Sequence, residues 1–366
     1  MTLFLTFVRK EFYHILRDRR TMLILMAMPI VMIILFGFAL STEVRNVNVA
    51  ILLPEPDNTS RQIIERLDAS KYFTVRGCIQ KPENIDEVFR SGKIDIVIAF
   101  GQNFSKNIIS PEGSQLQIIV NASDANMAQS YATYTRAVIT QHLSEAISQN
   151  YSGVFPNVLL LHNPQMKSSY NFVPGIMGLI FMLICAMMTS IAIVKEKETG
   201  TMEVLLVSPM HPTYIIFAKM IPYFTISCIN LATILLLSVF ILEVPVAGSI
   251  IALISVSLIY IFTTLALGLL ISTVAKQQII AMLFSAMLLM VPTILLSGLV
   301  FPIESMPKIL QLISCILPPR WYISAIRKLM IEGLPIIYAS KEIIILSIMS
   351  IIIITISLLK FKKRLE

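Results

Sequence analysis

The stretch VKEKETGTMEVLLVSP, residues 194–209, gathers the side chains of this chain that could do chemistry. A threonine can cap a short helix here, and a glutamate in the first turn of that helix is favoured by the helix dipole. The stretch places carboxylates and hydroxyls together and contains neither a histidine nor a cysteine. The chemistry it predicts is recognition of another molecule by charge. These side chains are Glu196, Glu198, Thr199, Thr201, Glu203 and Ser208.

The same stretch also contains a glycine that permits a bend, a group of apolar side chains and a Ser-Pro pair that ends a helix. Gly200 permits a tight bend, and Ser208-Pro209 ends any helix. A capped helix that projects from a membrane protein is a good docking element, since apolar side chains enter a groove while the glutamates set the orientation. The apolar side chains are Met202, Leu205 and Leu206. The alternative is a solvated loop whose charges only keep it out of the lipid.

No other part of the sequence carries a recognisable catalytic or cofactor motif. The chain has no GxxxxGK[ST] phosphate-binding loop, no HExxH and no GxSxG. The histidines are scattered, and the cysteines form no CxxC pair. We therefore predict no catalytic residue, metal or cofactor in this chain.

The composition is that of an integral membrane protein. Hydrophobic residues make up 56% of the 366 residues, charged residues only 14%, and the mean hydropathy is +0.78. A bilayer-spanning helix needs about 20 mostly apolar residues. Six runs meet this requirement: Thr21–Leu40, Phe172–Val194, Phe217–Leu242, Gly248–Thr273, Ile279–Val300 and Ile343–Leu359.

Nine of the 29 basic residues lie at the two ends of the chain, next to apolar runs. By the positive-inside rule, both termini are cytoplasmic, which six spans also require. The charges form no stripe on a soluble domain, so nucleic acid is not a predicted partner. The central parts of the spans hold no ionisable residue, which disfavours an ion-driven carrier. Lys219 and Glu243 lie at span ends, where we expect them to reach the membrane interface.

Residues 1–20 are predicted to form a cytoplasmic amphipathic helix that lies on membrane lipid. Residues 21–41 are predicted to form the first span. Apolar side chains recur at helical spacing from Phe4 to Leu16. A plain basic anchor for the first span is the alternative. The polar side chains of this interfacial helix are Arg9, Lys10, Glu11 and Arg17.

Residues 42–170 predict a separate α/β domain outside the cytoplasm. Strands are expected at Val47–Leu53, Phe73–Ile79, Ile94–Phe100 and Leu116–Val120. Helices are expected from about Ser60, over Pro82–Ser91, and from Asp124 towards Gln149. Alternating strands and helices favour a small α/β fold.

Residues 171–360 predict the other five spans, with a cytoplasmic coupling loop at 195–216 and a basic tail at 361–366. Short outer helices are expected within 301–340, at Pro307–Ile316 and Trp321–Ile331, either re-entrant or lying on the surface. Trp321 and Tyr322 should sit at the membrane interface. Three cationic side chains should reach water or headgroups: Arg320, Arg327 and Lys328.

Four motifs resemble the signatures of the ABC-2 family of ATP-binding-cassette permeases, above all the bacterial multidrug-efflux type with a large outer domain. They are Glu196-x-Glu198-Thr199-Gly200-Thr201-Met202-Glu203-x-Leu205-x-x-x-Ser208-Pro209, Lys219-x-x-Pro222-Tyr223, Ser297-Gly298-x-x-Phe301-Pro302-x-Glu304-x-Met306-Pro307 and Pro318-x-Arg320-Trp321-Tyr322. The order of leader, first span, outer domain and five clustered spans is also similar.

The resemblance implies an exporter permease in the bacterial inner membrane. A separate ATPase subunit, which binds ATP and magnesium, would contact the leader and the coupling residues Glu196, Glu198, Thr199, Gly200, Thr201, Glu203, Leu205, Ser208 and Pro209. Two such permeases, identical or merely similar, would form the pathway for an amphipathic or lipid-like substrate. The outer domain would receive substrate or dock a periplasmic adaptor. We expect Glu196→Lys with Glu203→Lys to uncouple the protein from its ATPase.

One alternative is a membrane-anchored receptor or assembly scaffold whose outer domain binds a ligand. It requires no ATPase partner and leaves the cluster of glutamates without a role. A membrane enzyme is less well supported, because no nucleophile, base or metal-ligand constellation is present.

Overall fold

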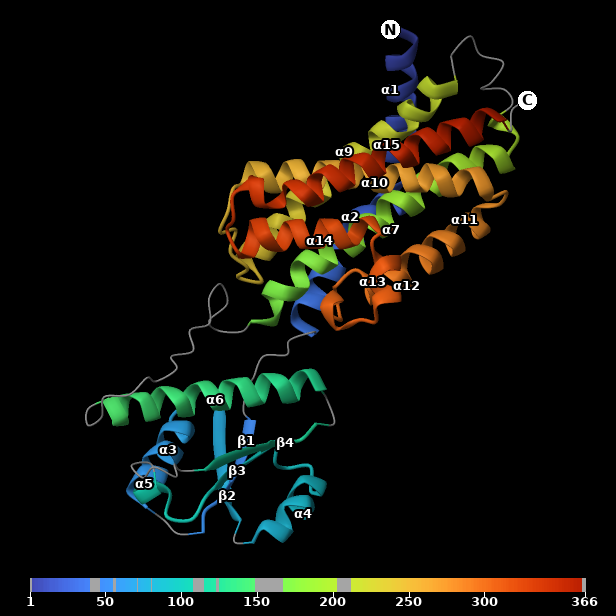
Figure 1. Cartoon of the computed structure of the whole chain (residues 1–366). Helices are drawn as coiled ribbons and strands as arrows, with labels where there is room; N and C mark the ends of the chain where they lie inside the picture. Colours follow the sequence, from blue (N-terminus) through green and yellow to red (C-terminus); the bar gives the residue numbers. More distant parts are fainter. Residues whose placement is uncertain are drawn as a thin grey trace. The chain divides into compact units, whose positions relative to one another are not determined.

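A computed structural model describes residues 2–39, 47–54, 57–70, 72–79, 81–107, 115–122, 125–148, 167–202 and 212–363. The chain forms two compact units (Figure 1). One unit comprises Met1–Ser41 and Lys167–Glu366, and the other comprises Thr42–Met166. The first unit is helical, and the second is built on a sheet.

The sheet of the second unit has four strands in the order β2-β1-β3-β4. Strand β1 (Val47–Leu52) pairs in parallel with β2 (Phe73–Ile79) and β3 (Ile96–Phe100), and β4 (Leu116–Val120) is antiparallel to β3. Its helices are α3 (Asn58–Asp68), the 3₁₀ turn Pro82–Asn84, α4 (Ile85–Arg90), α5 (Phe104–Asn107) and α6 (Ala125–Ser148). The predicted α/β fold of this segment is confirmed.

Helices cover both faces of this sheet, as its hydrophobic strands require. Helices α3 and α6 lie on one face, where Ile63 and Tyr134 pack against Val49. Helix α4 covers the other face, where Val88 packs with Val97. Figure 1 shows these two layers around the sheet. The predicted cap Asp124 lies outside the described residues.

Asp57 caps α3 and ties the loop after β1 to the start of α5. Its Oδ1 accepts a hydrogen bond from the Ser60 N–H at 2.7 Å, and its Oδ2 accepts one from the Ser105 N–H at 2.8 Å. Partial burial acts to raise the pKa of Asp57, but the hydrogen bonds from Ser60 and Ser105 outweigh it and lower the pKa below its ordinary value. The ionised carboxylate of Asp57 therefore stabilises the folded state at pH values above the pKa that Asp57 has in the unfolded chain. This stabilisation is lost as the pH falls through the pKa that Asp57 has in the folded state.

Replacing Asp57 by alanine should loosen α3 by about 1–2 kcal/mol, because the helix loses its N-cap. Hydrogen exchange of the α3 peptide in the full chain should accelerate about tenfold. Asp86→Ala is the matched control, since Asp86 is exposed in the first turn of α4 and makes no capping bond. Equal exchange in the two variants would contradict this assignment.

The helical unit begins with α1 (Thr2–Arg17) and α2 (Arg19–Ala39). The next three long helices are α7 (Ser168–Glu198), α9 (Pro212–Phe240) and α10 (Ile250–Val274). The segment Gln278–Leu296 comprises α11 (Gln278–Phe284), the π turn Ser285–Met290 and α12 (Val291–Leu296). The unit ends with α13 (Lys308–Ser314), α14 (Pro318–Ile326), the π turn Arg327–Ile331 and α15 (Ser340–Lys363), with 3₁₀ turns at Ile303–Ser305 and Ile336–Ala339.

Six helical segments in the described residues are long and apolar enough to cross a membrane, as the sequence predicts. They are Thr21–Phe38, Ser168–Glu198, Thr213–Phe240, Ile250–Val274, Gln278–Leu296 and Ile336–Lys360. A further pair, Lys308–Ser314 with Pro318–Ile331, would also pass as one span but is bent by 88°. The bend falls at Pro318 and Pro319, which cannot continue the preceding helix.

Helix α7 forms the centre of this unit. It packs against α2, α9, α10, α11 and α14, as its course through Figure 1 shows. Of its most apolar segment, 78% is buried, against 22% for the first span. At Gly268 of α10, an added Cβ would lie 2.9 Å from both Ala186 Cα and Thr189 Cβ of α7. The two helices therefore approach so closely that only glycine fits.

The interfacial position predicted for Tyr322 is wrong. Tyr322 is fully buried on α14, and its ring stacks on Tyr260 of α10 with centroids 4.1 Å apart. The Tyr322 hydroxyl lies 3.0 Å from Ser257 Oγ, so its polar end is satisfied inside the bundle. Helix α14 packs on α7, α10 and α15 and is not a shallow surface helix.

The three cationic side chains expected to reach water or headgroups bind protein groups instead. Arg320 donates to the Gln311 carbonyl at 2.6 Å and to Ser314 Oγ, and Arg327 donates to the Gly298 carbonyl at 2.7 Å. Lys328 pairs with Glu342 at 2.6 Å. The reason is that the bend at Pro318 brings carbonyl groups of α13 and a carboxylate of α15 within reach.

Candidate functional site

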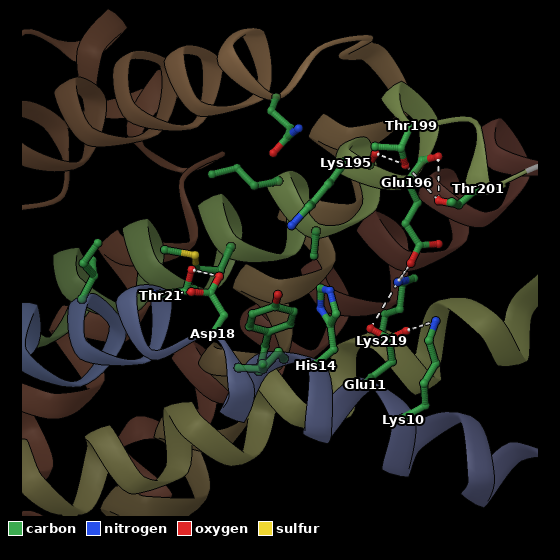
Figure 2. Close-up of a pocket in the computed structure, with 17 residues that line it drawn as sticks. Lys10, Glu11, His14, Asp18, Thr21, Lys195, Glu196, Thr199, Thr201 and Lys219 are labelled. Atoms are coloured by element: carbon green, nitrogen blue, oxygen red, sulfur yellow. Dashed lines mark hydrogen bonds and ion pairs between the residues drawn. The ribbon is translucent and has the colours of Figure 1, made fainter.

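Three charged side chains from three helices meet at one end of the helical unit. Lys219 of α9 lies 3.3 Å from Glu11 Oε2 of α1 and 2.5 Å from Glu196 Oε1 of α7 (Figure 2). We call Glu11, Lys219 and Glu196 the Lys219 cluster. The Lys219 side chain is only 4% exposed. The expectation that it reaches the membrane interface is therefore wrong, because two carboxylates are closer partners for a buried ammonium group.

Helix periodicity places Glu11 on the inner face of α1. Glu11 and Ile15 lie one turn apart, and both are buried. Arg9 and Arg17 are exposed, and Lys10 contacts Glu11 at 3.2 Å. A helix is present as predicted, but Glu11 faces the bundle while the arginines face away from it.

Glu196 reaches Lys219 because α7 continues to Glu198. The predicted coupling loop at 195–216 thus begins inside a helix and ends inside another, since α9 begins at Pro212. No residue between Val194 and Glu198 breaks a helix, so the charged turn extends the span without interruption. Its first break is Gly200, whose φ of +72° lies in the left-handed region that favours glycine.

The threonines lie where α7 ends, and the backbone is helical again at Thr201 and Met202. Thr199 is the C-cap residue of α7, and its hydroxyl donates to the Lys195 carbonyl at 2.9 Å. Thr201 donates to the Glu196 carbonyl at 3.3 Å. These bonds satisfy carbonyl groups that the end of a helix leaves without partners. The end of α7 is thereby fixed close to the Lys219 cluster.

Two more side chains of the same turn bind the junction of α10 and α11. Lys197 donates to the Ser272 carbonyl near the end of α10 at 2.5 Å. Glu198 accepts hydrogen bonds from the N–H and the side-chain amide of Gln278 at 3.0 and 2.9 Å. A cation near a helix end and an anion at a helix start both complement the helix dipoles. Adjacent residues of α7 therefore connect to different neighbours, which are α1 and α9 on one side and α10 and α11 on the other.

The prediction that Met202 enters a groove of a partner protein is wrong. Its side chain is 7% exposed and packs in the core of the helical unit, so it is not available to enter a groove of another protein. The remaining predicted residues lie outside the described residues: Glu203, Leu205, Leu206, Ser208 and Pro209.

A cavity of ≈ 660 Å³ lies beside the Lys219 cluster. Residues from α1, α2, α7, α9 and α11 line it, and Figure 2 shows Lys195 extending into it above His14. Its walls carry both charged and apolar side chains. The volume falls in the range of about 300–1,000 Å³ that is usual for small-molecule sites.

Sequence reasoning missed the internal role of Lys219 and the contact made by Gln278. A signal for Lys219 was present, because a lysine inside an apolar helix needs a carboxylate partner, and Glu11 and Glu196 lie on the flanking polar segments. Gln278 gave no such signal, since an amide at the start of a helix is common.

Comparison with known proteins identifies related chains. Residues 19–359 match the family described as ABC-2 family transporter protein. The probable multidrug ABC transporter permease YbhS of Escherichia coli K12 is 28% identical over 363 residues, which cover 98% of this chain and 96% of the relative. YbhR, a probable multidrug ABC transporter permease of the same organism, is 27% identical over 250 residues, or 67% of each chain. The inner membrane transport permease YhhJ is 24% identical over 175 residues, or 46% of each chain.

Proposed function

Because this chain belongs to the ABC-2 family of transporter proteins, we propose that it couples ATP hydrolysis by a separate ATPase subunit to export of an amphipathic or lipid-like substrate. Its place among multi-pass inner-membrane permeases favours transport over enzymatic activity and over a receptor or scaffold role. The observation that carries the coupling proposal is the Lys219 cluster, which joins α1 to the charged end of α7. Both segments are those through which the family resemblance implies contact with an ATPase.

We expect a displacement of residues 196–209 to be transmitted directly to the membrane-spanning helices. Glu196 shares Lys219 with Glu11, so the end of α7, α1 and the start of α9 move as one body. Lys197 and Glu198 pass the same displacement to Ser272 and Gln278. ATP-driven closure of the ATPase subunits would therefore rock several spans together and open a route outward or laterally.

Two copies of this permease, or this chain with a similar one, form the pathway in the proposed transporter, and two ATPase subunits bind their cytoplasmic ends. The positive-inside rule supports cytoplasmic termini and an outer position for residues 42–170. In that position the α/β domain can receive substrate or dock a periplasmic adaptor. A span interior without unpaired charge fits an amphipathic or lipid-like substrate better than a small ion.

Charge reversal at Glu203 is the test of ATPase binding that we choose. Since Glu196 pairs with Lys219, Glu196→Lys would place two lysines together, and its effect would not report on a partner. We expect Glu203→Lys alone to reduce the ATPase recovered with the permease at least about tenfold, as expected for loss of a charge contact at an interface. The measurement is purification in mild detergent at native expression level, followed by quantitative mass spectrometry.

The matched control is Glu304→Lys, the same charge reversal on an exposed residue of the turn Ile303–Ser305. Both variants should reach the membrane at the wild-type level. If no P-loop ATPase accompanies the wild-type chain even after crosslinking in the membrane, the proposed function is wrong.

A further inference from the structure

The cavity beside the Lys219 cluster contains two basic side chains that have no partner among the described residues. Lys195 of α7 and His14 of α1 line it and face each other across it (Figure 2). Within the described residues, the side chain of neither makes a hydrogen bond or an ion pair. A lysine with no carboxylate partner, at the wall of a cavity, is a ready site for an anionic group.

The other charged groups of the cavity are already engaged. Glu11 and Glu196 share Lys219, and Lys10 also pairs with Glu11. Asp18 accepts hydrogen bonds from the N–H and the hydroxyl of Thr21, at 3.2 and 2.6 Å, at the start of α2. Lys195 and His14 are therefore the basic side chains of the cavity that no described residue engages.

An apolar wall continues from these two cations along the spans. It is formed by Ile24 of α2 and by Met188, Ile191 and Ala192 of α7. Lys195 lies about one helical turn beyond Ile191 and Ala192 on the same helix, so the apolar side chains and the cation share one face. A ligand that fits this arrangement has an anionic head and a hydrocarbon chain.

We propose that this cavity binds an anionic amphiphile, with its phosphate or carboxylate at Lys195 and His14 and its chain along Ile24, Met188 and Ile191. The identification of this amphiphile as cargo rests on the proposed export function. Binding itself does not, because every group that forms the cavity belongs to this chain. The site lies where the first span begins, since Thr21 and Ile24 of α2 line it.

The test is equilibrium binding of lysophosphatidate to the purified full chain in nonionic detergent without ATP. Lys195→Met should weaken binding about tenfold, because a charge-assisted hydrogen bond is lost. Lys195→Arg should retain most of the affinity. The control Lys276→Met removes an exposed lysine from the loop between α10 and α11, outside the cavity, and should leave the affinity unchanged. Equal affinity in the two methionine variants would overturn the site.

A second set of ligands measures separately how much the anionic headgroup and the hydrocarbon chain contribute to binding. Monoacylglycerol, which lacks the anion, should bind at least about tenfold more weakly than lysophosphatidate. Glycerol 3-phosphate, which lacks the chain, should not compete. If glycerol 3-phosphate binds as tightly as lysophosphatidate, the ligand is a soluble phosphate and the amphiphile is excluded.

A photoactivatable lysophosphatidate, with the reactive group in its chain, provides a readout of position. Crosslinks should map to the peptides of Ile24, Met188 and Ile191, and Ile191→Trp should reduce them by filling the cavity. Crosslinks confined to other helices would overturn the proposal. The ATPase recovered with each preparation is measured in parallel, so a permease that keeps its ATPase but binds no amphiphile contradicts this inference and leaves the proposed function intact.

Discussion

Replacing Lys219 by methionine should release α1 from the helical unit and abolish coupled transport. The substitution leaves Glu196 without its cation and leaves Glu11 paired only with the exposed Lys10. Removal of one partner from a buried ion pair costs about 3–5 kcal/mol, since the remaining charge is uncompensated. Hydrogen exchange of the α1 peptide in the purified full chain should accelerate by on the order of 100-fold.

Two further variants show whether the faster exchange of α1 arises from the uncompensated charge of buried carboxylates. Lys219→Met combined with Glu11→Gln and Glu196→Gln removes both carboxylate charges and should restore slow exchange of α1, even if coupling stays weak. Lys276→Met removes an exposed lysine between α10 and α11 and should change neither exchange nor transport. Unaltered exchange of α1 in Lys219→Met would show that the Lys219 cluster does not hold α1.

Replacing Gly268 by leucine should disrupt the central contact between α7 and α10. Even a Cβ atom at this position would lie 2.9 Å from Ala186 Cα, so a leucine must push two backbones apart. Overpacking of this kind costs about 1–3 kcal/mol or more, and here the obstacle is backbone, which cannot change rotamer. The yield of monodisperse protein and its melting temperature in detergent should both fall.

Ser255→Leu is the matched control on the same helix. Ser255 is exposed on α10, so a leucine there meets lipid in the membrane and displaces no helix. It should express and melt as the wild-type chain does. A stable, monodisperse Gly268→Leu protein would contradict the close approach of α7 and α10.

Much of the fold could be predicted from the sequence because its signals are local. A run of about 20 apolar residues specifies a membrane-spanning helix whatever surrounds it. Alternating apolar strands and helices in residues 47–148 similarly predicted the α/β fold, including strands at Phe73–Ile79 and Leu116–Val120. The bounds at the end of α7 were less accurate, because a polar helix turn and a polar loop have the same composition.

The candidate site was only partly predictable, for a different reason. The sequence drew attention to Glu196, Glu198 and Thr199 by their types and spacing, but it assigned them to an external partner. In the structure, Glu196 binds Lys219, Glu198 binds Gln278 and Thr199 closes α7. Each of these contacts except the last joins residues far apart in the chain, and local spacing does not specify such pairs.

The sequence by itself determined the class of this protein, because hydropathy, terminal charge and the motif at Glu196–Pro209 are properties of short segments. Only the tertiary structure decided which charges face inward. Tyr322, Arg327 and Lys219 each look like interface residues when read along one helix. They are satisfied inside the bundle because neighbouring helices present a stacked ring, a carbonyl and two carboxylates within reach. Burial of a polar group depends on its partners, and partners are set by packing.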